Sequence, residues 1–148
     1  MLYNPDRAQL RRFYFTAWRK YRLHAPMEPM ERLVAEVIAR HPEYHGLFEK
    51  ELGDEEILGR DYLPEMGETN PFLHLGLHLG LLEQVSADRP AGIAAIFHEL
   101  ARHSGDPHEA EHRMMECLAE MIWQAQRNGA QPDEAAYLER LRGLGGGN

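Results

Sequence analysis

Apolar residues recur along the chain at helical spacing, and no stretch alternates between apolar and polar residues as a strand would. A capping residue followed by proline marks helix starts at Asn4-Pro5, Asn70-Pro71 and Asp106-Pro107. The pattern predicts main helices over residues 5–23, 29–40, 71–86, 90–102, 107–128 and 132–142, with a short helix over 42–51.

We therefore expect an all-α fold, a single-domain helical bundle of about five to six helices over residues 1–142. Gly129 stands where a helix ends, and residues 143–148 are predicted to form a flexible glycine-rich tail. The polar stretch from Gly53 to Thr69 is expected to be the longest irregular connection.

Composition narrows the classes of protein to consider. The 148 residues are 43% hydrophobic and 27% charged, as in one globular domain, and the net charge of −8 argues against nucleic acid as a partner. The lone Cys117 excludes an internal disulfide and is interpreted as a small core residue. No apolar run reaches the roughly 20 residues of a membrane span. We expect a cytoplasmic protein with no membrane partner, and leave open whether it forms a homo-oligomer.

The first helix is basic, since residues 1–25 hold six basic residues and one acidic residue, a local charge of +5. Its arginines are a candidate surface for an acidic partner: Arg7, Arg11, Arg12, Arg19 and Arg22. Residues 26–70 hold twelve acidic residues against four basic ones, so pairing with this stretch is the interpretation we favour.

Histidine is the unusual residue type, with nine copies. Random placement predicts roughly half a pair at spacing i, i+4, a check that any motif requires. Three such pairs occur: His41 with His45, His74 with His78, and His108 with His112. On one helix this spacing places two imidazoles one turn apart, where both can bind one metal ion.

The first two pairs differ in context. His41 and His45 straddle the break before Pro42, so a role as metal ligands is the less favoured interpretation, and we favour His41 as a cap and His45 as a surface residue. His74 and His78 lie in a segment that is apolar nearly all round, which indicates burial. Their nitrogens then need either a metal or hydrogen bonds within the core, and both alternatives stay open.

The third pair spells H-E-A-E-H, the zinc-peptidase pattern in which Glu109 would be the general base. The pattern opens a helix in a chain without strands, so Glu109 is more simply a capping residue opposite Asp106. Both histidines border the apolar arc of the helix, and Glu116 continues their stripe. The candidate metal ligands are His74, His78, His108, His112 and Glu116.

Nitrogen and carboxylate ligands suit zinc, iron, nickel or manganese. The chain carries no motif for a nucleotide cofactor.

Several blocks together suggest a family, and they extend over nearly the whole chain: N-P-D-R, F-x-F-x-A-W-R-K-Y, H-P-E-Y-H, G-E-T-N-P-F-L-H-L-x-L-H-L and H-E-A-E-H-x-M-M-E-C-L. The chain resembles an uncharacterised family of small proteobacterial proteins, domain of unknown function 1841, which implies no known activity. H-E-A-E-H-R after an earlier helix histidine is also similar to DinB-like metal-binding four-helix bundles. That similarity implies His108 and His112 as a metal-binding pair, with His74 or His78 as third ligand.

Two functions follow as hypotheses. The first is a divalent-metal-binding helical bundle with a histidine-rich site between two helices. The second is a non-enzymatic interaction or adaptor domain whose histidines are structural. Three protein ligands would leave a position for an activated water, whereas four would close the site, so the sequence decides neither whether the protein is an enzyme nor how many metal ions it holds.

Overall fold

The computed structural model describes residues 5–50, 58, 60–62 and 70–146, and over these residues it is all-helical, with no strand. Its described part contains seven α-helices and one 3₁₀ helix, more than the expected five to six, and the helix in excess of six is the short one after His41, where a 3₁₀ turn leads into α3. The elements are α1 (Pro5–Arg22), α2 (Pro29–Ala39), η1 (Pro42–Tyr44), α3 (His45–Phe48), α5 (Pro71–Ala87), α6 (Ile93–Ser104), α7 (Pro107–Asn128) and α8 (Glu134–Gly146).

The chain divides into two compact units, residues 1–75 and 76–148, and α5 begins in the first and continues into the second. The single domain predicted over residues 1–142 stays a prediction. The stretch from Gly53 to Thr69 falls largely outside the described residues. No helix in the described part of the chain combines the length and apolarity needed to cross a membrane.

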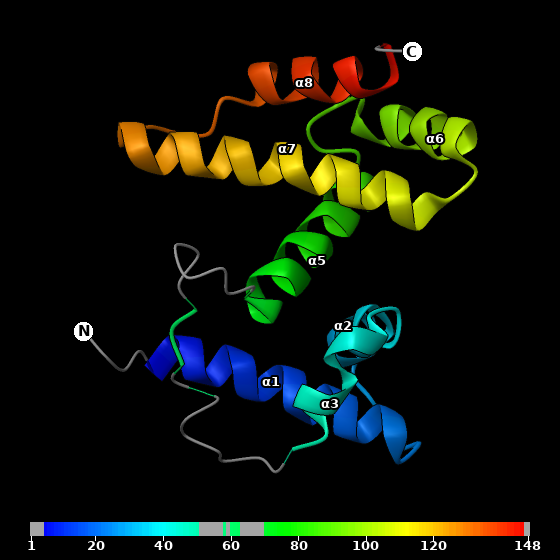
Figure 1. The fold of residues 1–148 in the computed structure, drawn as a ribbon, viewed down its shortest axis with the longest axis vertical. Helices are drawn as coiled ribbons and strands as arrows, with labels where there is room; N and C mark the ends of the chain where they lie inside the picture. The colour runs from blue at the N-terminus through cyan, green and yellow to red at the C-terminus, as the bar shows by residue number, and fades with distance from the viewer. Residues whose placement is uncertain (1–4, 51–57, 59, 63–69, 147–148) are drawn as a thin grey trace. The chain divides into compact units, whose positions relative to one another are not determined.

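In residues 1–75, α1 packs against α2 and α3 (Figure 1). Helix α2 starts at Pro29, where Glu28 and Glu31 form a capping box and the Glu31 carboxylate accepts the Glu28 backbone N–H at 2.9 Å. At the start of α5, the Asn70 side chain accepts the backbone N–H groups of Phe72 and Leu73, as the Asn-Pro signal predicts. Aromatic and aliphatic residues form the core: Tyr14, Phe15, Trp18, Val34, Val37, Ile38, Phe48, Phe72 and Leu75.

The arginines of α1 have different surroundings. Arg7 forms an ion pair of 2.6 Å with Asp61. The guanidinium of Arg11 is buried and donates to the backbone carbonyls of Leu58 and Arg60, so Arg11 is not on an exposed surface. The Arg7 ion pair agrees with pairing between the first helix and the acidic stretch, while three arginines of the candidate surface are exposed: Arg12, Arg19 and Arg22.

In residues 76–148, α6, α7 and α8 pack against one another (Figure 1). As predicted, α7 spans residues 107–128: the Asp106 side chain accepts the His108 backbone N–H, and Gly129 closes the helix with a φ of 58°. The core of this unit gathers residues from all of its helices: Leu81, Ile93, Leu100, Ala110, Met114, Met115, Cys117, Leu118, Met121, Tyr137 and Leu141.

Several helix ends differ from the sequence prediction, and for two of them the structure shows the local contacts. Helix α6 begins at Ile93 rather than Pro90, because Gly92 has a φ of 101° and the Asp88 carboxylate caps the backbone N–H groups of Gly92 and Ala94. Helix α8 continues to Gly146, through residues expected to be a flexible tail, and Arg113 donates to the Leu144 carbonyl. A contact with another helix thus extends α8 beyond what glycine propensity favours.

Candidate metal centre

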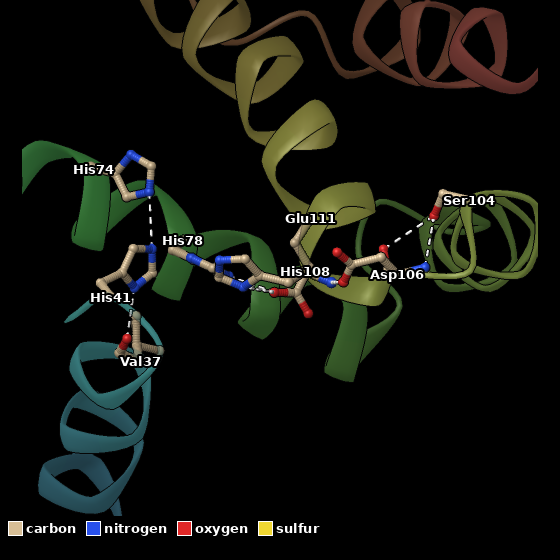
Figure 2. A network of polar contacts seen from close by, with 8 residues as sticks. All are labelled: Val37, His41, His74, His78, Ser104, Asp106, His108 and Glu111. Atoms are coloured by element: carbon tan, nitrogen blue, oxygen red, sulfur yellow. Dashed lines mark hydrogen bonds and ion pairs between the residues drawn. The ribbon is translucent and has the colours of Figure 1, made fainter. Parts of the chain in front are cut away.

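In residues 76–148, α5 and α7 bring together His78, His108 and Glu111 (Figure 2). Each residue offers one ligand atom, and these three atoms all lie within 4.8 Å of one another. The His78 side chain is fully buried, Glu111 is 4% exposed, and His108 is half-buried. Ligands of this kind rarely meet in a protein interior without forming a specific interaction, because burial of charged and polar groups is costly.

The Glu111 carboxylate is the centre of this group. The His78 Nε2 atom lies 2.5 Å from Glu111 Oε1, and His108 Nδ1 lies 3.9 Å from the same oxygen. His108 and Glu111 are three residues apart on α7 and therefore lie on the same side of the helix. The His112 ring is near both histidines, with its centroid 4.2 Å from that of His108 and 5.3 Å from that of His78.

The structure places Glu111, rather than the predicted Glu116, beside the histidines. Glu116 is exposed on α7 and is absent from the groups of possible ligands found among the described residues. Glu111 precedes the buried Met114, Met115 and Leu118 by three, four and seven residues, which is the spacing of one helix face. That spacing was a signal in the sequence that a carboxylate lies on the buried side.

In residues 1–75, His74 contacts His41, which the sequence favours as a helix cap over a metal ligand. The Nε2 atoms of the two imidazoles are 3.1 Å apart, and His41 Nδ1 donates to the Val37 carbonyl at 2.7 Å (Figure 2). His41 does stand at the start of η1, but its fully buried side chain makes no capping hydrogen bond. The contact spans 33 residues of sequence, so no local spacing could reveal it.

His45 is not part of this pair. Its Nε2 donates to the Ile38 carbonyl at 2.8 Å, and its ring lies against Trp18 with centroids 4.6 Å apart. The side chain is half-buried rather than on the surface. Cys117 is a buried member of the core, as predicted, and burial raises the pKa of its thiol, which disfavours the reactive thiolate.

The chain belongs to the family described as domain of unknown function (DUF1841), whose model matches residues 6–143. This match confirms the family resemblance of the sequence. No curated protein and no solved structure matches the chain.

Proposed function

We propose that residues 76–148 bind one divalent transition-metal ion through His78, His108 and Glu111. The observation that carries the proposal is the convergence of their three ligand atoms within 4.8 Å in a largely buried position. Two imidazoles and one carboxylate form a ligand set that suits zinc, iron, nickel or manganese. His78 and His108 were already candidate ligands in the sequence prediction, whereas Glu111 replaces the predicted Glu116.

The distances fit an ion after a small adjustment. Tetrahedral zinc, with bonds of about 2.0–2.1 Å, holds neighbouring ligand atoms about 3.3 Å apart. The 2.5 Å contact between His78 Nε2 and Glu111 Oε1 must therefore lengthen by about 0.8 Å on binding. His108 Nδ1, at 3.9 Å from the same oxygen, must approach by a similar amount.

The number of protein ligands determines whether the metal ion can also bind a water molecule. Three protein ligands leave a position for a water molecule, whose pKa a metal ion lowers, whereas recruitment of His112 would close the site. His112 is close enough in ring position to His108 and His78 for either arrangement. We propose a metal-binding site, and assign no reaction to it.

A second candidate function rests on the same contact. The buried hydrogen bond between His78 Nε2 and Glu111 Oε1 gives both of these atoms a partner within the protein. In that case the histidines are structural, and the protein is a non-enzymatic interaction domain. Its partner would meet the exposed arginines of α1, among them Arg19 and Arg22.

Metal binding separates the two functions. Untagged, metal-stripped full-length protein is titrated by calorimetry with zinc, iron(II), nickel and manganese, and protein purified without added metal is subjected to elemental analysis. We compare wild type with Glu111→Gln and His108→Ala, while His103→Ala is the matched control, because His103 is an exposed histidine of the same unit paired with Glu99.

We expect at least tenfold weaker binding at this site in Glu111→Gln and in His108→Ala, with His103→Ala unchanged. Circular dichroism and urea unfolding establish that each variant is folded. Equal affinities in wild type and both site variants, or no binding of any of the four metals, would overturn the proposal. If none of the four metals binds, the non-enzymatic interaction domain is the candidate function that remains.

A further inference from the structure

The histidine pair of residues 1–75 has a geometry of its own. His41, which directly precedes η1, and His74, in the first turn of α5, face each other with their Nε2 atoms 3.1 Å apart (Figure 2). His41 is fully buried and His74 is half-buried. The three residues of the proposed metal site, His78, His108 and Glu111, all belong to the other unit.

The hydrogen bond to Val37 determines which nitrogen of His41 carries the proton. A backbone carbonyl only accepts, so at 2.7 Å from the Val37 oxygen the Nδ1 atom of His41 must be protonated. In the neutral ring the lone pair then lies on Nε2, which is the atom that faces His74. Metal-binding histidines are held in this way, with one ring nitrogen donating to a carbonyl or carboxylate and the other bound to the ion.

Aromatic packing holds both rings in place. The Tyr44 ring stacks on His41, with centroids 5.7 Å apart and planes at 11°, and meets the edge of His74 at 5.9 Å. The two imidazoles are nearly perpendicular, at 76°. Burial raises the pKa of the Tyr44 phenol, so this neighbour stays neutral. A preorganised pair of nitrogen atoms loses little conformational entropy when it binds an ion.

We infer that His41 and His74 bind one divalent transition-metal ion through their Nε2 atoms, at a second site made of residues 1–75 alone. The separation of 3.1 Å is close to the roughly 3.3 Å between neighbouring ligands of tetrahedral zinc. Water completes the coordination. Binding moves the ring proton of His74 from Nε2 to Nδ1, whereas His41 keeps the tautomer that its bond to Val37 imposes.

Nitrogen magnetic resonance tests the inference on the wild-type chain, without any variant that risks misfolding. Full-length protein labelled with ¹⁵N in its histidines is titrated with zinc, and the ring nitrogens are followed in long-range ¹H–¹⁵N spectra. We expect the Nε2 signals of His41 and His74 to shift toward metal-bound values, while His41 Nδ1 stays protonated. Unchanged Nε2 signals of this pair at zinc saturation would overturn the inference, and the pair would then be a hydrogen bond between two rings.

Stoichiometry separates this site from the one proposed above. Wild type should bind two tight equivalents of zinc, His74→Ala one, Glu111→Gln one, and the double variant no tight equivalent. His45→Gln is the matched control, because His45 lies in the same unit and bonds to Ile38 rather than to the pair. If the site of His78, His108 and Glu111 does not bind zinc but the His41 and His74 pair does, wild type binds one equivalent and His74→Ala binds none. If His74→Ala binds as much zinc as wild type, the second site does not exist.

Discussion

The buried bond between His78 and Glu111 makes a stability prediction for the metal-free protein. The two side chains are 0% and 6% exposed and their atoms are 2.5 Å apart. Glu111→Ala removes one partner and leaves the imidazole N–H buried without its acceptor, which should cost an amount in the upper part of the roughly 1–3 kcal/mol typical of an unsatisfied buried donor. Glu111→Gln keeps an oxygen acceptor and loses only the charge, so it should cost about 1–2 kcal/mol, the difference between charge-assisted and neutral hydrogen bonds.

Urea unfolding in the presence of a chelator measures these free energies. Glu116→Ala is the matched control, because Glu116 is exposed on the same helix, and its effect should stay within about 0.5 kcal/mol. Excess zinc should raise the free energy of unfolding of wild type, by about 2.7 kcal/mol at one hundred times Kd. The reasoning is refuted if Glu111→Ala costs no more than Glu116→Ala, or if the glutamine and alanine variants are equally destabilised.

Three further predictions concern Glu31, Gly105 and Cys117. The hydrogen bond from Lys20, and then that from the Glu28 backbone, hold the pKa of Glu31 below its ordinary 4.5, so this carboxylate stabilises the fold above pH 4.5 and loses that effect as pH falls through its lowered pKa. Lys20→Met should therefore be less stable than wild type at pH 7, and the gap measured by urea unfolding should close in acid. Gly105→Ala, at a φ of 73°, should destabilise by about 1–2 kcal/mol in thermal unfolding, and a neutral result would contradict the backbone assignment. Cys117 should react with a thiol reagent at pH 8 at least tenfold more slowly in native protein than in urea, because it is buried with a raised pKa.

Helix boundaries were largely predictable because their signals are local. The Asn70 and Asp106 side chains cap the helices whose first residue is the following proline, and each makes its hydrogen bonds within three residues. Long amphipathic segments such as residues 107–128 likewise carry their period in their own sequence. The end of α8 escaped prediction because it depends on a contact with Arg113 rather than on the propensity of glycine.

The candidate site was predictable in part. The spacing of His108 and its neighbours on α7 pointed to one of the two helices that carry the candidate ligands, and the apolar context of His78 indicated the burial that the structure shows. The choice of Glu116 instead of Glu111 followed from a stripe drawn through the histidines alone, whereas the packing of neighbouring helices decides which face is buried. The contact of His41 with His74 joins residues far apart in the chain, and no helical period encodes such a contact.

Anomalous X-ray diffraction from crystals of zinc-loaded full-length protein tests the central proposal most directly, because it locates the ion itself. The account predicts a zinc peak within about 2.0–2.2 Å of nitrogen atoms of His78 and His108 and of a Glu111 oxygen. Zinc-loaded crystals of Glu111→Gln should lack that peak or show it much weakened. No zinc peak at these three residues, with the 2.5 Å contact between His78 and Glu111 intact, would contradict the account, whether or not zinc is bound at His41 and His74.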